Sequence, residues 1–189
     1  MKINGLLFFG LVGCCMSMMS CGRGKELLSE KNYDSLFLGI HLGMTRSEFY
    51  DHCAELNRLK VFTHGPTNTS VEYMLTSELE KPVVMRFYPS FYKDRIVDMP
   101  VTFSYEAWAP WNKQFSSDSL LTKMLPVFKK WYGEDFKVIQ HPSQGKVYVK
   151  MDGKRRINLF LRDDQFVQAV FTDLALEKER KREEAEKSN

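Results

Sequence analysis

The sequence predicts an α+β fold made of two tandem units, each a helix followed by a four-stranded antiparallel sheet. A helix-start pattern at Thr45 precedes apolar residues at helical spacing, and a second such pattern follows Ser116. Each pattern is followed by four short extended runs. With 43% hydrophobic residues, the chain has enough apolar side chains to bury a core.

The first helix is predicted over about residues 45–59. The Thr45 hydroxyl and the Glu48 carboxylate match a capping box, in which each side chain satisfies an exposed backbone N–H at the helix start. Phe49, Cys53 and Leu56 follow at helical spacing and form one apolar face. Extended runs are then predicted near 60–63, 71–76, 83–88 and 96–105.

The second helix is predicted to begin at Ser116-Ser117-Asp118 and to end at Gly133. Pro126 lies inside it and removes a helical hydrogen bond, so we expect a kink or a break into two short helices there. Extended runs follow at 136–140, 146–151, 155–161 and 166–173.

The strongest local signal is the run Met151-Asp152-Gly153-Lys154, which predicts a β-hairpin. Asp-Gly tolerates the positive φ of a tight turn. Apolar residues alternate on both sides of it, as strands require: Val147, Val149 and Met151 before, and Ile157, Leu159 and Leu161 after.

The N-terminus is predicted to be a lipoprotein signal. Lys2 precedes an apolar run, Gly5–Val12, that is far shorter than the ~20 apolar residues a membrane-spanning helix needs. The sequence becomes polar directly after Ser20-Cys21, which resembles the lipobox where a signal peptidase cuts before a lipid-modified cysteine. We therefore expect lipidation at Cys21, with Cys14 as the alternative.

This interpretation divides the chain into five parts. They are a signal peptide (1–20), the lipidated cysteine with a polar tether (21–37), a first α+β repeat (38–112), a second repeat (113–175) and a charged tail (176–189). The tail has ion-pair spacing but no apolar stripe, so it is predicted to be either a solvated helix or disordered.

Composition and motifs exclude several classes of partner. The 27 Lys and Arg residues are nearly balanced by 24 Asp and Glu residues, so no basic field predicts nucleic-acid binding. The four histidines are scattered, without a second metal ligand at zinc-like spacing. No phosphate-binding loop or nucleophile elbow occurs. We expect no cofactor, no metal and no catalytic residues.

Asp51-His52-Cys53 is the one sequence that invites a nucleophile interpretation, because a base beside a thiol can generate a thiolate. Neighbouring residues on a helix do not face each other, however, and Cys53 lies on the apolar face with Phe49. We favour a core cysteine. The alternative function is a periplasmic enzyme that uses Cys53 and a distant histidine.

Aromatic residues concentrate around and between the predicted repeats. Consecutive rings in a strand point to opposite faces, so some rings are expected on an exposed face. Tyr and Trp are enriched in binding hot spots. The predicted partner-binding surface is Tyr88, Tyr92, Tyr105, Trp108 and Trp111. Packing of the joint between the repeats is an equal alternative for Trp108 and Trp111, whereas Phe87 and Trp131 are predicted to be core.

The run Leu38–Phe49, with Gly43-Met44-Thr45 at the helix start, resembles the opening of small outer-membrane lipoproteins of the SmpA/OmlA (BamE) type. The predicted tandem layout resembles β-lactamase-inhibitor-protein folds. The chain is longer than the SmpA type and lacks its Gly-x-Pro element, of which Gly65-Pro66 is only a loose echo. The resemblance implies a binding or assembly role without catalysis and carries over no site residues.

Together these observations predict a lipid-anchored, non-catalytic binding or scaffold module of the cell envelope. It would be held at a membrane by its N-terminal lipid, on the periplasmic side and at the outer rather than the inner membrane. Its partner would be a protein or another envelope component. Capture of a small ligand between sheet and helix is a further possibility that requires a pocket.

Overall fold

The computed structural model describes residues 33–188. The predicted signal peptide, Cys14, Cys21 and the tether up to residue 32 lie outside the described residues. In the part that is described, no helix is both long and apolar enough to cross a membrane.

The first half of the fold begins with helix α1 (Arg46–Arg58), as predicted. Thr45 caps it: the Glu48 N–H donates to the Thr45 hydroxyl at 3.3 Å, and the Thr45 N–H donates to the Glu48 carboxylate at 2.8 Å. After it come β1 (Thr63–His64), η1 (Pro66–Asn68), β2 (Val71–Leu75), β3 (Val83–Phe87), β4 (Ser90–Tyr92) and β5 (Arg95–Tyr105).

Strand β4 was not predicted, and the extended run expected at 60–63 overlaps the two-residue strand β1 only at Thr63. The turn between β4 and β5 consists of Lys93 and Asp94, which both have positive φ. Neither residue is a glycine or asparagine, so the sequence lacks the usual signal of such a turn.

The second half contains η2 (Lys113–Phe115), α2 (Ser117–Tyr132), β6 (Lys137–His141), β7 (Gly145–Asp152), β8 (Arg155–Leu161), β9 (Val167–Asp173) and α3 (Leu174–Lys187). Helix α2 has the predicted ends, with Ser116 as its N-cap and Gly133 as its C-cap. Of the kink or break predicted at Pro126, the break into two short helices is wrong, because one helix continues through that residue. Pro126 and Thr122, whose carbonyl loses its helical partner, are both exposed, so water can solvate that carbonyl.

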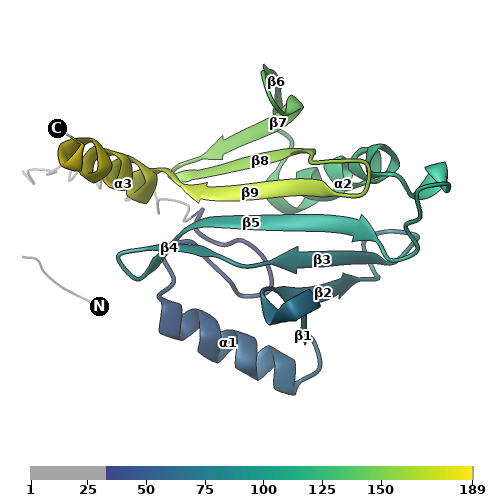
Figure 1. Cartoon of the computed structure of the whole chain (residues 1–189), viewed down its shortest axis with the longest axis horizontal. Helices are drawn as coiled ribbons and strands as arrows, with labels where there is room; N and C mark the ends of the chain where they lie inside the picture. The colour runs from purple at the N-terminus through teal and green to yellow at the C-terminus, as the bar shows by residue number, and fades with distance from the viewer. Residues whose placement is uncertain (1–32, 189) are drawn as a thin grey trace, which may run out of the picture. The chain divides into compact units, whose positions relative to one another are not determined.

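The nine strands of residues 33–188 form one antiparallel sheet in the order β1-β2-β3-β5-β9-β8-β7-β6, with β4 paired to the start of β5. The α+β class is therefore confirmed, but the strands are not divided into separate sheets. Strands β5 and β9 join the two halves through six residue pairs, from Asp98↔Thr172 to Phe103↔Val167. In Figure 1, α1 lies beside the β1–β2 end of the strand order, whereas α2 lies beside β8 and β9 in the middle of it.

The core lies between the sheet, α2 and the segment that precedes α1. Helix α2 packs on β5 and β9 through Phe128, whose ring centroid is 5.8 Å from that of Phe103 and 6.2 Å from that of Phe171. Phe37 contacts the Phe87 and Phe171 rings at 5.0 and 5.8 Å. Residues at the end of the predicted tether thus belong to the folded core.

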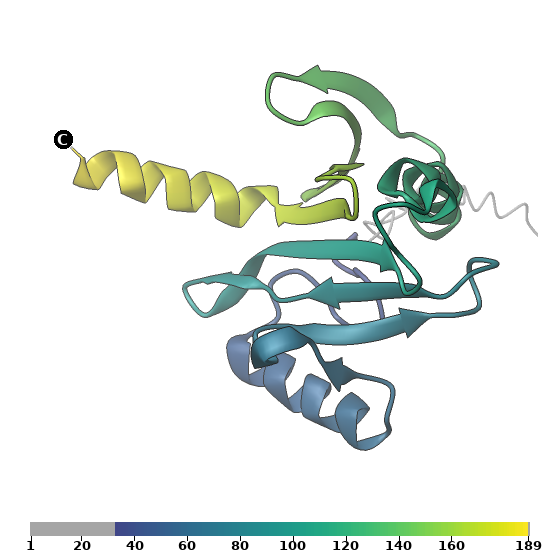
Figure 2. The same cartoon turned by 45° about the vertical axis from the view of Figure 1, so that its right-hand side comes forward.

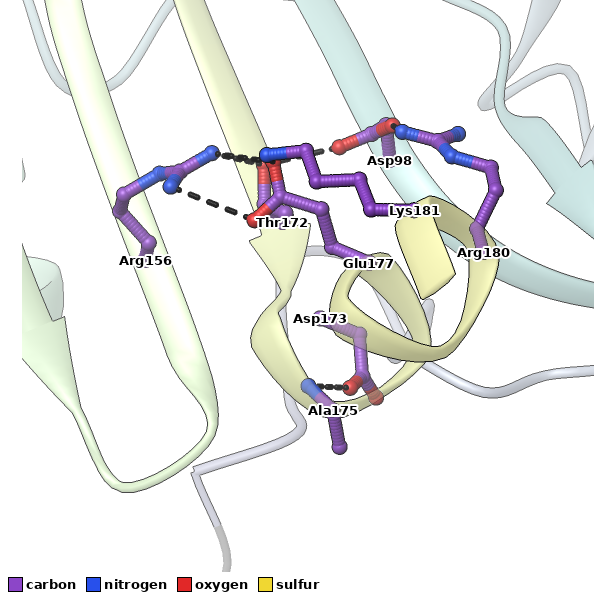
Figure 3. A network of polar contacts seen from close by, with 8 residues as sticks. All are labelled: Asp98, Arg156, Thr172, Asp173, Ala175, Glu177, Arg180 and Lys181. Carbon is purple, nitrogen blue, oxygen red and sulfur yellow. Dashed lines mark hydrogen bonds and ion pairs between the residues drawn. The ribbon is translucent and has the colours of Figure 1, made fainter. Parts of the chain in front are cut away.

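The charged tail forms a helix that is tied to the sheet by ionic contacts. No residue of α3 is buried, and Figure 2 shows the helix extending away from the sheet beyond β9. Figure 3 shows that Glu177 of α3 pairs with Arg156 of β8, and Arg180 of α3 with Asp98 of β5. Lys93 contacts the carboxylates of Glu179 and Glu183, each at 2.6 Å. Of the two predicted outcomes, the helix is the one observed.

Candidate ligand-binding cavity

A cavity of about 380 Å³ lies between the sheet, the C-terminal end of α2 and the segment before α1. This volume falls in the range of small-molecule sites. We call it the central cavity. The described residues that line it are Ser35, Leu36, Phe37, Leu38, Tyr73, Leu75, Glu78, Met85, Trp131, Tyr132 and Arg155.

One wall of the central cavity is a turn held by backbone hydrogen bonds. The Leu36 N–H donates to the Ile40 carbonyl at 2.9 Å, and Ser35 pairs with His41 in a β-bridge. Gly39 has φ +81°, and a Cβ there would lie 2.8 Å from the His52 ring, so the turn requires glycine. This glycine lets residues 35–38 lie against the sheet.

Helix α2 fixes the same turn from the other side. The Tyr132 hydroxyl donates to the Leu36 carbonyl at 2.9 Å. Burial raises the pKa of Tyr132, although nearby Arg155 opposes this shift, so the hydroxyl remains a donor at neutral pH. The end of α2 and the segment before α1 are therefore joined at the cavity by a part-buried hydrogen bond.

Charged groups are buried beside the central cavity. Lys150 and Arg155 are each 5% exposed. Both contact Asp152: the Lys150 Nζ lies 3.1 Å from one carboxylate oxygen, and an Arg155 Nη donates to the other at 2.9 Å. The Arg155 guanidinium also donates to the Ser35 carbonyl and lies 5.1 Å from the centre of the Tyr132 ring. Buried charges need such partners to offset desolvation.

The sequence analysis missed this charged group, although a signal was present. Arg155 is in phase with Ile157 and Leu159 along β8, and all three are buried. On β7, the alternating apolar residues are not buried along the whole strand: Met151 is 63% exposed, whereas its neighbour Lys150 is buried. A charged residue at a position of β8 where alternation predicts a buried side chain was therefore the sequence signal for the central cavity.

A second cavity, of about 390 Å³, lies between α1 and the β1–β2 end of the sheet, and we call it the outer cavity. The residues that line it are Phe49, Tyr50, Cys53, Ala54, Asn57, Phe62, Thr63, His64, Asn68, Ser70, Val71 and Tyr88. Cys53 is half-buried and packs against the core, and burial raises the pKa of its thiol to about 11. The thiol is therefore protonated at neutral pH.

The five predicted partner-binding residues do not form one surface. Tyr105 pairs with Val83 at the start of β3, whereas Tyr88 directly follows the last residue of β3. The two tyrosines therefore lie toward opposite ends of this strand pair. Tyr105 is also buried, at 7% exposed, with its ring 5.3 Å from Phe115. It cannot contribute to a free surface, which corrects that part of the prediction.

The other four residues differ widely in exposure. Trp111 is 85% exposed, whereas Trp108 is half-buried and its indole N–H donates to the Asp164 carbonyl at 3.4 Å. Tyr88 is 39% exposed, and its hydroxyl lies 2.5 Å from that of Tyr50. Tyr92 is half-buried beside Lys93. Of the two residues predicted to be core, Phe87 is buried and Trp131 is half-buried at the central cavity.

Within residues 33–188, no group of three or more His, Cys, Asp or Glu side chains is placed to hold a metal ion. Comparison with protein families, curated proteins and solved structures finds no match to this chain.

Proposed function

We propose that this protein is a lipid-anchored binding module of the cell envelope that holds a small, mostly apolar ligand in its central cavity without catalysing a reaction. The observation that carries the proposal is the cavity itself. It combines a volume suited to a small molecule with mainly apolar and aromatic walls and one buried arginine. The predicted lipid at Cys21 would keep this module at a membrane surface.

The tandem organisation supports a binding role for the centre of the molecule. The order of a helix followed by strands occurs twice, and the last strand of each half, β5 or β9, pairs with the other at the middle of the sheet. We propose that this is the arrangement of the BamE-like and β-lactamase-inhibitor-like proteins that the sequence resembles. In such a layout the central cavity receives residues from both halves, which makes it the natural place for a ligand.

The test is to fill each cavity separately in the full, lipidated chain held in lipid nanodiscs. Glu78→Trp places a large ring at the central cavity, and Ala54→Trp does the same at the outer cavity of similar volume. The probe is 4-phenylbutan-1-ol, a neutral and water-soluble apolar molecule, titrated by calorimetry with empty nanodiscs as background. We expect Glu78→Trp to weaken binding by about tenfold or more, and Ala54→Trp to leave it unchanged.

Two results would contradict the proposal. One is that the wild-type chain does not bind the probe above the nanodisc background. The other is that Ala54→Trp weakens binding while Glu78→Trp has no effect, which would assign the ligand to the outer cavity.

A protein partner is a second candidate function, favoured by one observation. Trp111 is 85% exposed, and large exposed aromatic side chains are frequent in binding hot spots. Pull-down from envelope fractions with the Trp111→Ala chain should then recover less partner than the wild type, whereas Tyr105→Phe, at a buried ring, should recover the same amount. Equal recovery from wild type and Trp111→Ala would remove this surface.

A further inference from the structure

Two buried cations beside the central cavity share one carboxylate as their charged partner. Lys150 and Arg155 are two buried cations that share the single carboxylate of Asp152. The next carboxylate, Asp135, lies 3.6 Å from Lys150 but is 92% exposed, so water screens it strongly. A second buried carboxylate, Asp173, is 2% exposed, lies opposite Arg155 on the neighbouring strand β9 and contacts Lys154 at 3.7 Å. The charges in this part of the described structure are therefore close to balanced, and Arg155 has only a share of the Asp152 carboxylate.

Arg155 also has a donor to spare. One Nη donates to the Ser35 carbonyl and the other to Asp152. Its Nε is buried and has no hydrogen-bond partner among residues 33–188. A buried donor without an acceptor is costly, and most such groups in folded proteins are satisfied by protein, water or a ligand.

The groups around Arg155 define what acceptor would suit it. The guanidinium lies over the Tyr132 ring at 5.1 Å, and the cavity beyond is lined by Leu36, Leu75 and Met85. Glu78, the carboxylate among the described residues that line the cavity, accepts a hydrogen bond from the Ser77 hydroxyl at 2.9 Å. Glu78 also acts with burial to raise the pKa of Tyr73, which places its charge beside β2.

We infer that the ligand of the central cavity is a monocarboxylate with an apolar tail, whose carboxylate accepts a hydrogen bond from Arg155 while its tail fills the apolar part. Carboxylates form the strongest hydrogen bonds that a guanidinium makes in proteins. Repulsion from Glu78 disfavours a carboxylate at the β2 side, so it orients the molecule. This inference rests on the proposed function, since it names the ligand class of the same cavity.

The test compares two molecules that differ only in their head group. The wild-type chain in nanodiscs is titrated with 4-phenylbutanoate and with 4-phenylbutan-1-ol at pH 7 and low salt. We expect the carboxylate to bind about tenfold more tightly, and this preference to shrink as salt is added. Equal affinities, or tighter binding of the alcohol, would overturn the inference while leaving the proposed function intact. Binding of neither molecule would overturn both.

Two variants assign the preference to the charged groups. Arg155→Lys keeps the charge but removes Nε, so the carboxylate should lose its advantage while the alcohol binds as before. Glu78→Gln removes the opposing charge at a half-buried position and should strengthen carboxylate binding several-fold without affecting the alcohol. Circular dichroism checks that each variant is folded. If Arg155→Lys does not fold, an unchanged carboxylate affinity in Glu78→Gln contradicts the inference by itself.

Discussion

The central and outer cavities have nearly the same volume, about 380 and 390 Å³, but their walls differ in charge and origin. The central cavity is lined by residues from both halves of the chain, and these include Arg155 and Glu78. Of the described residues that line the outer cavity, all belong to the first half and none is Asp, Glu, Lys or Arg. Volume alone therefore does not distinguish them, whereas a buried charge that must be compensated does.

The largest difference should appear when each cavity loses its characteristic side chain. Arg155→Met breaks a buried ion pair and should lower the free energy of unfolding by about 3 kcal/mol or more. Cys53→Ala, at a half-buried position of the outer cavity, should cost about 1 kcal/mol. Urea unfolding measures both. Similar losses for the two variants would mean that the charged wall is no more important to the fold than the apolar one.

The reactivity of the Cys53 thiol tests the outer cavity in the same comparison. Burial raises the pKa of this thiol to about 11 from an ordinary 9.0. The contribution of the thiol to the free energy of unfolding is therefore fully present below pH 9 and is lost as the pH rises through 11. At neutral pH the thiolate population should be about 100-fold lower in the folded chain than in the unfolded one.

Alkylation of Cys53 by iodoacetamide, followed by peptide mass spectrometry, measures this difference with and without denaturant. We expect slow labelling of the native chain and fast labelling in urea. Fast labelling of the native chain would favour the alternative function, an enzyme that uses Cys53 with a histidine such as His64, which lines the same cavity.

Removing one tyrosine hydroxyl at each cavity should give a smaller difference in stability between the two cavities. Tyr132→Phe removes the donor to the Leu36 carbonyl at the central cavity and should cost about 1 kcal/mol of unfolding free energy. Tyr50→Phe removes a bond between two exposed hydroxyls at the outer cavity and should change stability by less than about 0.5 kcal/mol. Thermal unfolding of the two variants in parallel tests this order, and the reverse order would contradict it.

Acid should release helix α3 with little effect on either cavity, since none of the described residues that line them comes from α3. Hydrogen bonds from Lys93 lower the pKa of Glu183. Burial alone would raise the pKa of Glu177, but its bonds to Lys181 and Arg156 make the net shift downward. Because these carboxyls have lowered pKa values in the folded chain, their contribution is present above the ordinary pKa near 4.5 and is lost as the pH falls below it.

Hydrogen exchange of the α3 amides between pH 7 and pH 3 measures that release. We expect the α3 amides to lose protection as the carboxyls are protonated, and high salt at pH 7 to act in the same direction. Lys93→Ala should reproduce part of the effect at neutral pH. Unchanged α3 protection at pH 3 would mean that contacts other than these ion pairs hold the helix.

The sequence predicted those features that depend on neighbouring residues. Thr45 and Glu48 cap α1, Ser116 and Gly133 bound α2, and the turn at Gly153 joins β7 and β8. Each of these is encoded within a few positions, where capping and turn chemistry act. The strands of the second half were found for the same reason, since alternation and turn residues mark them locally.

Features that depend on distant residues could not be predicted in this way. The pairing of β5 with β9 merges the two halves into one sheet, and no local pattern specifies it. Lys93 and Glu179, which help to dock α3, are 86 positions apart. The central cavity has the same character, because Leu36, Met85 and Arg155 meet only in the folded chain. The predicted aromatic surface was wrong because the antiparallel pairing of β3 with β5 places Tyr88 and Tyr105 toward opposite ends of these two neighbouring strands.

The most direct test of a ligand in the central cavity is an NMR titration of the chain labelled at the methionine methyl groups. Met85 lines the central cavity, whereas Met99 and Met124 are buried, are not among the described lining residues of either cavity and serve as references. When 4-phenylbutanoate is added, we expect the Met85 signal to shift and saturate while the Met99 and Met124 signals stay in place. A Met85 signal that does not move, at ligand concentrations that saturate calorimetric binding, would contradict the assignment of the ligand to this cavity.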